Sequence, residues 1–356
     1  MGLTILDPDE RGAVTIPARQ RPSVVGTAAD RAVAADAELA EMGQDEVLAG
    51  IDRLRQERGA MVLAHNYEAG AIQDLADVVG DSLELARRAA ASDAELIVVC
   101  GVHFMAETAS ILCPDKVVLT PEPDAGCSLA ASVTAPEILE WKRAHPDGVV
   151  VSYVNTTAEV KAVSDLCCTS SNATNVVASI DPDADVLFLP DTALGLHVER
   201  ATGRRLHLWL GECHVHAAIS YDDVAERARR HPGAELLIHP ECRCAGDCLR
   251  AVEDGSLPIR GLTVASTGGL VAHARGNESE VALVATEVGM LHRLRKESER
   301  TRFVAVRDDA ICEYMKAITP AKLYRTLRDL EYPVEVPPGI AEPARRALEA
   351  MVAVSP

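Results

Sequence analysis

The sequence is short of basic residues. Its 356 residues include 35 Lys and Arg against 54 Asp and Glu, and the formal net charge is −19 at pH 7. A chain this acidic repels the phosphates of nucleic acids and anionic membrane surfaces, so we expect neither as a partner. Any anionic substrate must then be held by local groups rather than by a broad positive field.

Long hydrophobic runs are absent as well. No apolar stretch reaches the roughly 18 residues that a membrane-spanning helix needs, and the N-terminal stretch MGLTILDPDERGAVTIPARQRPSVVG has no continuous apolar core of a secretion signal. We therefore expect a cytoplasmic protein. Its ten cysteines then indicate metal binding or catalysis, because the reducing cytoplasm disfavours disulfides.

The length and the apolar fraction are sufficient for a globular protein of more than one domain. Apolar residues make up 48% of the chain, enough to build real cores. Residues 1–44 combine Pro, Gly, Ala and scattered charge without periodicity, and we interpret them as an N-terminal extension that is partly disordered or lies on the surface. The folded part should begin with a helix in DEVLAGIDRLRQERG.

Three segments share one pattern, an apolar strand that ends in a pair of polar side chains. The segments are AMVLAHNY, GVVVSYVN and AELLIHPE, and each is apolar enough to be a buried parallel strand. The pairs are His65 with Tyr67, Tyr153 with Asn155, and His239 with Glu241. Because side chains alternate along a strand, both members of a pair point to the same side of the strand end.

A serine follows each pair at a related distance. From the first residue of the pair to the serine, the spacing is 17, 17 and 27 residues. The third spacing is longer, as expected if ten residues that include the CRCAGDC stretch were inserted. The serines are Ser82, Ser170 and Ser266. Each lies in a turn that can begin a helix, where backbone N–H groups and the helix dipole favour an anion.

Second and third strands follow in each segment, and a cysteine lies beyond each third strand. The second strands are LIVVCGV, DVLFLPD and EVALVATE, and the third are KVVLT, LHLWL and RFVAV. The cysteines are Cys127, Cys213 and Cys312. We infer three α/β units packed around an axis, at residues 45–131, 132–217 and 218–356, the last with C-terminal helices. Because ligands of such sheets bind beyond the carboxyl ends of the strands, the three cysteines should converge on one central cavity.

Three converging thiolates favour an iron–sulfur cluster over a structural zinc. A lone intracellular cysteine is more often a small buried hydrophobe, but the matched positions reverse that expectation for these three. Structural zinc usually has four ligands in two close pairs, whereas these cysteines are 86 and 99 residues apart. On a 4Fe–4S cube with three thiolates the fourth iron is open, and an open iron is a Lewis acid that favours dehydration.

The densest group of cysteines lies within the insertion of the third unit. Chemistry common to all three units is not expected there, so we interpret His239 and Glu241 as the functional part of HPECRCAGDC. A separate zinc site and a disulfide switch are the alternatives for Cys242, Cys244 and Cys248. The histidines that lack a matched position are expected to be structural or exposed: His103, His145, His197, His207, His214, His231, His273 and His292.

The chain resembles the NadA-type quinolinate synthase family across roughly residues 45–340. The stretches that carry the resemblance occur in the family's order and with its spacing: LAHNYEAGAIQDLADVVGDSLELAR, GVHFMAETASILCPDKVVL, SYVNTTAEVKAVSDLCCTSSNA, HPEC and CEYMKAITPAKLY. Two short segments depart from it. The first tripeptide is His-Asn-Tyr where many relatives have His-Tyr-Tyr, and ASTGGL stands for the more usual GSTSGM.

The resemblance implies three αβα domains in a pseudo-threefold arrangement around one 4Fe–4S cluster per chain. The implied cluster ligands are Cys127, Cys213 and Cys312. The implied reaction condenses iminoaspartate with dihydroxyacetone phosphate to quinolinate, with loss of phosphate and water, in NAD biosynthesis. The implied substrate-binding residues are His65, Ser82, Tyr153, Asn155, Ser170, His216, Ser266 and Thr267, and Tyr67, His239 and Glu241 complete the site. A transient contact with the enzyme that delivers the unstable iminoaspartate is a further expectation.

Forming an aromatic ring requires several proton transfers, and Tyr67 and Glu241 are the candidates for them. They occupy matching strand-end positions in the first and third units and should face each other across the cavity. Glu241 would be the base if the cavity raises its pKa, and Tyr67 would give a proton to the leaving oxygen. Two rival functions remain, a 4Fe–4S hydro-lyase of the aconitase kind and a non-enzymatic iron–sulfur redox sensor.

Overall fold

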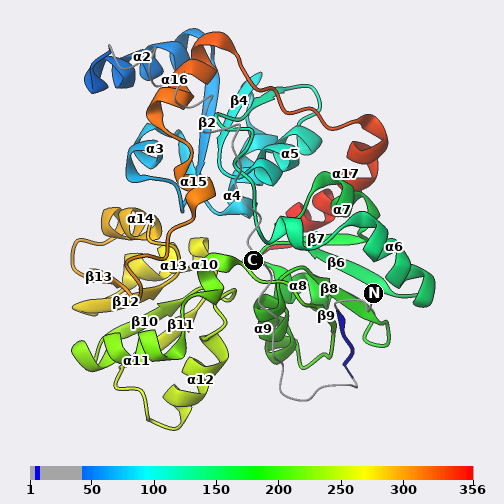
Figure 1. Ribbon diagram of the computed structural model, residues 1–356, viewed down its shortest axis with the longest axis vertical. Helices are drawn as coiled ribbons and strands as arrows, with labels where there is room; N and C mark the ends of the chain where they lie inside the picture. Colours follow the sequence, from blue (N-terminus) through cyan, green and yellow to red (C-terminus); the bar gives the residue numbers. More distant parts are fainter. Residues whose placement is uncertain (1–4, 9–41, 356) are drawn as a thin grey trace.

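The computed structural model describes residues 5–8 and 42–355, which form three sheets of mainly parallel strands covered by helices (Figure 1). In spatial order, the first sheet contains β3 (Val78–Gly80), β2 (Ala60–His65), β4 (Leu96–Cys100) and β5 (Val117–Leu119). The second contains β1 (Ile5–Leu6), β9 (His207–Trp209), β8 (Val186–Leu189), β6 (Val149–Tyr153) and β7 (Leu166–Cys168). The third contains β11 (Gly261–Val264), β10 (Glu235–Ile238), β12 (Val281–Ala285) and β13 (Arg302–Ala305).

Helices connect the strands and continue to the C-terminus. Those of the first half are α2 (Gln44–Glu57), α3 (Gly70–Leu75), α4 (Ser82–Ala91), α5 (His103–Leu112), the 3-10 turn η1 (Ala130–Ser132), α6 (Ala135–Ala144), α7 (Ala158–Val163) and α8 (Ala173–Ala178). Those of the second half are α9 (Thr192–Thr202), α10 (His214–Ala217), α11 (Tyr221–Arg230), α12 (Ala245–Glu253), α13 (Thr267–Gly276), α14 (Met290–Glu297), α15 (Glu313–Lys316), α16 (Pro320–Asp329) and α17 (Pro338–Ala353).

The three sheets repeat one strand order. Apart from β1, which adds to the edge of the second sheet, the earliest strand of each sheet (β2, β6 or β10) pairs with the next two strands in the sequence, one on either side, and the last strand (β5, β9 or β13) pairs outside the third. All of these pairings are parallel, and the one antiparallel pairing in the described sheets joins β1 to β9. The expected α/β class is therefore confirmed, while the pseudo-threefold relation between the units and their boundaries stay predictions.

Burial on both faces explains why these short apolar runs become parallel strands. Every residue of β4 is buried, and so are all four of β8, because helices cover both sides of each sheet. Polar residues begin the helices that follow. Asp81 caps α4 by accepting a hydrogen bond from the Glu84 amide at 2.9 Å, and Ser220 accepts one from the Asp223 amide at the start of α11 at 3.2 Å.

The nine strands and the first helix that the sequence predicts are all present, but four strands were missed. Strands β3, β7 and β11 have three or four residues each and lie just before the serine turns, where no alternating pattern marks them. β1 has only two residues and exists through its pairing with the edge of β9. It belongs to the expected N-terminal extension, and apart from residues 5–8 and 42–44 that prediction lies outside the described residues.

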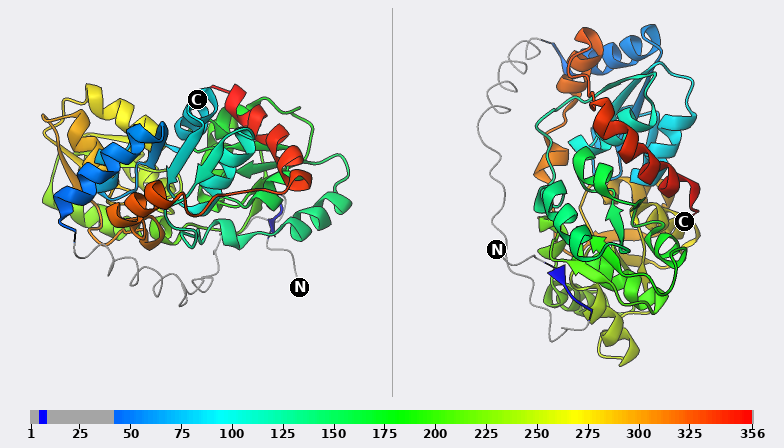
Figure 2. Two further views of the ribbon diagram at one scale, coloured as in Figure 1. Left: turned by 90° about the horizontal axis from the view of Figure 1, so that it is seen from above. Right: turned by 90° about the vertical axis from the view of Figure 1, so that its right-hand side faces the viewer.

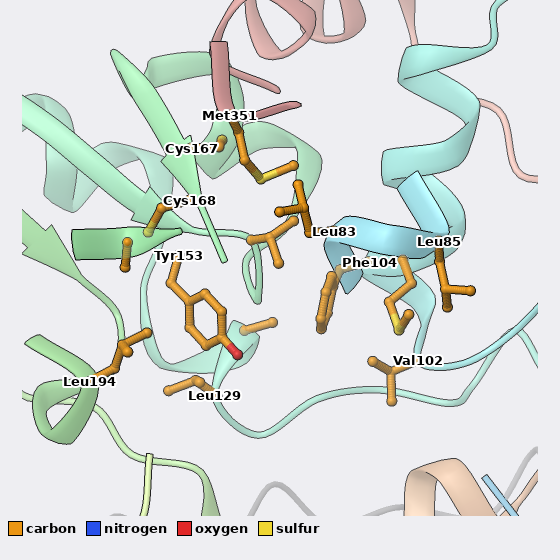
Figure 3. Packing of buried hydrophobic residues seen from close by; sticks show 14 of the residues in the cluster. Leu83, Leu85, Val102, Phe104, Leu129, Tyr153, Cys167, Cys168, Leu194 and Met351 are labelled. Atoms are coloured by element: carbon orange, nitrogen blue, oxygen red, sulfur yellow. The ribbon is translucent and has the colours of Figure 1, made fainter. Parts of the chain in front are cut away.

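The C-terminal helices pack mainly on the first two sheets rather than on the third. α16 lies against α2, and α17 lies across α7, β7 and α5 (Figure 2). The side-chain amide of Asn172 holds the end of α17 by donating to the Met351 carbonyl at 2.9 Å. Figure 3 shows Met351 packed near Cys167 and Leu83, which belong to different sheet units. The last segment therefore joins the first two units.

Each helix in residues 42–355 is too short or too polar to cross a bilayer.

A buried ion pair fixes α16 and gives the first prediction. The Nζ atom of Lys322 lies 2.7 Å from Oε2 of Glu122, and both side chains are about 6–7% exposed. Removing the lysine leaves a carboxylate without its partner in a buried place, so Lys322→Ala should lower the free energy of unfolding by about 3–5 kcal/mol. Urea denaturation would measure the loss.

The matched control is Arg53→Ala. Arg53 pairs with Glu57 at 3.7 Å on the exposed face of α2, and such a surface pair contributes less than about 0.5 kcal/mol. Equal stability losses in the two variants would show that the buried pair does not stabilise the packing of α16.

Candidate functional site

A cavity lies where the carboxyl ends of strands from all three sheets meet. From the first sheet it is lined by His65, Tyr67, Ser82 and Cys127, from the second by Tyr153, Asn155, Ser170, Cys213 and His216, and from the third by His239, Glu241, Thr267 and Cys312. Every one of these residues follows or ends a strand. The structure thus brings together all but one of the residues proposed from the sequence.

Ser266 is the exception. Its hydroxyl caps α13 by accepting from the Gly269 amide at 3.2 Å, and it also accepts from the Ser171 hydroxyl at 2.8 Å. Ser266 therefore does not line the central cavity, although the next residue, Thr267, does. The Thr267 hydroxyl accepts a hydrogen bond from the Asn66 amide at 2.9 Å. Ser266 does not face the cavity because a helix-capping hydroxyl turns toward the start of its own helix.

The three cysteines beyond the third strands line this one cavity. Cys127 precedes η1, and Cys213 and Cys312 are the residues just before α10 and α15. In the first of these turns a backbone N–H group points at sulfur: the Ala130 amide donates to the Cys127 Sγ at 3.5 Å. Burial raises the pKa of Cys127 and Cys213 to about 11 and that of Cys312 to about 12. Such thiols lose their protons when a metal cation binds them.

Cys312 is held by a network that the sequence did not reveal. Oε1 of Glu287 accepts a hydrogen bond from the Cys312 amide at 3.0 Å, and Oε2 accepts one from the Gly289 amide at 2.6 Å. Lys316 neutralises this buried carboxylate at 2.8 Å and donates to the backbone carbonyl of Tyr67. The loop that carries one cysteine is therefore tied to the strand end that carries Tyr67.

A chain of polar contacts joins Tyr67 to Tyr153 across the cavity. The Tyr67 hydroxyl lies 3.2 Å from Nε2 of His216, and Nδ1 of His216 lies 3.0 Å from Oε2 of Glu241. The Nδ1 contact is electrostatic, because this nitrogen has no hydrogen-bond partner of good geometry among the described residues. Tyr153 donates a hydrogen bond to Oε1 of Glu241. His216 thus lies between Tyr67 and Glu241, which were expected to face each other across the cavity.

The protonation states of the residues in this series of contacts differ from those expected. Burial alone would raise the pKa of Glu241, but His216, His239 and the Tyr153 hydroxyl together lower it to about 2. The cavity therefore does not raise the Glu241 pKa, the condition under which the sequence made Glu241 a base, and a carboxylate with these partners stays ionised. Burial lowers the pKa of His65 to about 4 and that of His239 to about 3, so both imidazoles are neutral near pH 7.

Sequence reasoning missed Thr286, which contacts two residues that line the cavity. Its hydroxyl lies 2.6 Å from the Tyr67 hydroxyl and 3.0 Å from Nε2 of His216, so it completes a triangle of polar atoms. Thr286 directly follows β12, just as Tyr67 and Glu241 follow their strands by two or three residues. The strand-end rule applied to second strands would have found it.

The remaining predicted residues carry polar atoms that face the cavity. The Ser170 hydroxyl lies 3.3 Å from Nε2 of His239, whose ring stacks on His216 with centroids 4.9 Å apart. Oδ1 of Asn155 is buried and has no hydrogen-bond partner among the described residues. A buried acceptor without a donor is costly, so a bound molecule that supplies an N–H or O–H group would satisfy it.

The cysteines of HPECRCAGDC lie outside the cavity. Cys242, Cys244 and Cys248 are buried at the start of α12, within a hydrophobic core around the third sheet. The thiol of Cys242 donates to the Ala285 carbonyl at 3.1 Å. α12 has nine residues where the corresponding α3 and α7 have six each, which accounts for part of the longer spacing in this unit. Their position matches the interpretation that His239 and Glu241 are the functional part of that stretch.

Comparison with known proteins identifies relatives over most of the chain. A family model described as Quinolinate synthetase A protein matches residues 49–353. The quinolinate synthase of Mycobacterium tuberculosis strain H37Ra is 56% identical over 313 residues, which cover 88% of this chain and 90% of the relative. That of Mycolicibacterium paratuberculosis strain K-10 is 54% identical over 313 residues, with the same coverage. That of Thermus thermophilus is 54% identical over 302 residues, covering 85% of this chain and 95% of the relative.

The convergence of three thiols predicts that bound metal depends on each of them. Cys213→Ser should lose most of the iron and sulfide of anaerobically prepared protein, because a hydroxyl is a poor substitute for a thiolate ligand. Elemental analysis and the visible spectrum would measure this loss.

The matched control replaces Cys242, Cys244 and Cys248 together by alanine. That variant also removes three buried thiols, yet it should retain its iron because none of the three lines the cavity. Loss of iron in the control, or full iron in Cys213→Ser, would contradict the assignment.

Proposed function

Because the chain belongs to the quinolinate synthetase A family, we propose that it condenses iminoaspartate with dihydroxyacetone phosphate to quinolinate, with loss of phosphate and water. The observation that supports this best is the meeting of three cysteines and a set of uncharged polar groups at one cavity. Small dicarboxylates and phosphates suit such a cavity, since hydroxyls, neutral imidazoles and helix N-termini bind their oxygens without a large positive field.

The proposed cofactor is one 4Fe–4S cluster per chain, held by Cys127, Cys213 and Cys312. The residues fit it, because the three sulfurs share one cavity and a backbone N–H donates to sulfur at Cys127. When bound, the cluster supplies an iron without a thiolate, which is a Lewis acid toward a substrate oxygen.

A single metal ion held by Cys213, His216 and Glu241 is a weaker alternative. One ligand atom from each of these residues lies within 4.8 Å of the others. His216 and Glu241, however, already contact the hydroxyl groups of Tyr67 and Tyr153. This alternative uses only one of the three cysteines that line the cavity, so the cluster, which uses all three, explains their convergence better.

The neutral groups of the cavity are proposed to bind and orient the substrates. His65, Ser82, Tyr153, Ser170 and Thr267 offer hydroxyl and imidazole groups to carboxylate and phosphate oxygens, and His216 also faces the cavity. Asn155 offers an acceptor oxygen, which suits an imine N–H or a substrate hydroxyl rather than an anion. Ser266 is proposed to act indirectly, by holding the start of α13 next to Thr267.

Tyr67 and Glu241 are proposed to transfer the protons, and His239 is proposed to position His216 between them. Glu241, which is ionised because its pKa is low, takes the proton that the enolising triose phosphate loses. Nδ1 of His216, 3.0 Å from Oε2 of Glu241, is the neighbour that receives this proton once the ring turns into hydrogen-bond geometry. Tyr67 gives its hydroxyl proton to a departing hydroxyl, which leaves as water, and recovers a proton from Nε2 of His216. His239 stacks on His216 and keeps its ring in place.

The proposal places the enzyme in the cytoplasm, where thiols stay reduced. It also includes a transient contact with the enzyme that produces iminoaspartate, because that compound decomposes in water.

The test is an anaerobic assay of quinolinate formation by the cluster-loaded chain. Quinolinate should appear only when iminoaspartate and dihydroxyacetone phosphate are both supplied, with one phosphate released for each quinolinate. A chain that keeps its cluster but forms no quinolinate, or that dehydrates a single hydroxy acid without phosphate release, would contradict the proposal and favour a hydro-lyase.

The proton relay gives a prediction for two variants. Tyr67→Phe and Glu241→Gln should each lower turnover about 100- to 10,000-fold while binding of quinolinate changes little, because each removes a group that transfers a proton. Turnover and equilibrium binding of quinolinate would be measured on protein whose cluster spectrum is intact.

Thr286 supplies the matched pair for this experiment. Thr286→Val removes the hydroxyl that contacts Tyr67 and should lower turnover, whereas Thr286→Ser keeps the hydroxyl and should retain most of it. Near-normal turnover in Tyr67→Phe and Glu241→Gln, or a loss confined to affinity, would assign the proton transfers to other groups.

A further inference from the structure

Two histidines and an aspartate lie close together at the amino-terminal end of the strands of the second sheet, opposite the cavity. His145 follows the end of α6, Asp185 directly precedes β8, and His207 is the first residue of β9. They lie at the amino-terminal ends of the strands, whereas the cavity described above lies at the carboxyl ends. One ligand atom from each lies within 4.8 Å of the others.

The spacing of these atoms is close to that around a bound metal ion. Nε2 of His207 lies 3.7 Å from Oδ1 of Asp185. Around a tetrahedral zinc ion with bonds of about 2.0–2.1 Å, neighbouring ligand atoms are roughly 3.3 Å apart. A side-chain movement of a few tenths of an ångström is therefore enough to bring these two ligands to bonding distance.

The hydrogen bond that His145 makes leaves one of its two ring nitrogens available to bind a metal ion. Nδ1 of His145 lies 3.1 Å from the Trp141 carbonyl, which can only accept, so Nδ1 carries the proton and Nε2 has its lone pair available. The His145 ring stacks on Trp141, with centroids 4.4 Å apart and an angle of 13° between the planes. Metal-binding histidines are commonly oriented in this way, by a carbonyl on the second nitrogen.

His207 has a corresponding partner in the N-terminal segment. Its Nδ1 lies 3.9 Å from Oδ2 of Asp7, the residue after β1, on the side of the ring away from Asp185. A carboxylate facing the second nitrogen of a ligating histidine makes that histidine a better ligand. The 3.9 Å separation is longer than a hydrogen bond, so Asp7 completes a carboxylate–histidine–metal arrangement when it moves about 1 Å closer to His207.

The surroundings allow an ion to enter. The His207 side chain is 8% exposed, whereas that of Asp185 is 65% exposed, so the group opens to solvent on one side. Two imidazoles and one carboxylate, with a water completing the set, are a donor set for Zn²⁺ and related borderline divalent ions.

We propose that His145, Asp185 and His207 form a second metal site, for Zn²⁺ or a similar divalent transition-metal ion, with Asp7 supporting His207. This site is independent of the proposed function, because none of its residues lines the cavity. Its consequence is structural. A bound ion links α6, β8 and β9, and through Asp7 it strengthens the attachment of β1 to the edge of the second sheet.

The test is calorimetric titration of ZnCl₂ into the untagged full chain, prepared anaerobically so that its iron content is retained. The chain should bind one zinc in addition to its iron, and zinc should raise its melting temperature. Asp185→Asn should weaken zinc binding at least tenfold, and Asp7→Asn about 10- to 100-fold. Asp185 is exposed, so its variant should fold normally.

Two controls make the result specific. Asp183→Asn changes an exposed carboxylate of the same loop and should leave zinc binding unchanged. The triple alanine variant of Cys242, Cys244 and Cys248 should also bind zinc normally, which separates this site from the buried thiols. If the unmodified chain binds no zinc, or if Asp185→Asn and His145→Gln bind it as tightly as the unmodified chain, the three residues form only ion pairs and the proposal is wrong.

Discussion

The carboxyl ends of parallel strands from three sheets meet at one cavity, and the reactive side chains lie where they do because of this constraint. A parallel strand delivers its last residues to one edge of the sheet, so each strand adds a side chain to the same space. The cavity therefore collects His65, Tyr153 and His239 from equivalent strand ends, and cysteines from the loops beyond the third strands. Because the strands of each sheet run in the same direction, their ends bring together residues that are far apart in the sequence.

A charged group buried among these polar side chains needs partners of its own. Glu241 is 4% exposed, and an isolated carboxylate there would take up a proton. Contacts with Tyr153 and His216 keep it ionised, and His216 in turn contacts Tyr67. The proposed binding of anionic substrates by a chain with a net charge of −19 relies on local groups in the same way, because the cavity offers hydroxyl and imidazole groups rather than excess lysine and arginine.

Much of this arrangement could be predicted from the sequence, because it depends on patterns that repeat. Three apolar strands with polar ends, three serine turns and three later cysteines recur at matched spacing, and the cavity is lined by nearly all of them. The family resemblance adds His216 and Thr267, which the spacing does not single out. Ser266 was placed in the cavity because position alone does not show that its hydroxyl turns back to cap α13.

Other features could not be predicted, because they depend on contacts between distant segments. The place of α17 on the first two sheets follows from packing against α7 and β7, not from its position at the end of the chain. His145 and His207 were expected to be structural or exposed, since no sequence spacing relates them to Asp185. The pairing of β8 with β9, and the end of α6 beside them, bring the three together.

The proposed cluster has three thiolate ligands, so one of its four irons should be open to the substrate. Mössbauer spectroscopy of anaerobic protein, enriched in the Mössbauer-active iron isotope, tests it directly when recorded with and without a saturating amount of quinolinate. We expect a four-iron cluster in which quinolinate changes the Mössbauer signal of one iron and leaves the signals of the other three nearly unchanged. A mononuclear iron signal, or a cluster spectrum that stays the same when bound quinolinate is verified separately, would contradict it.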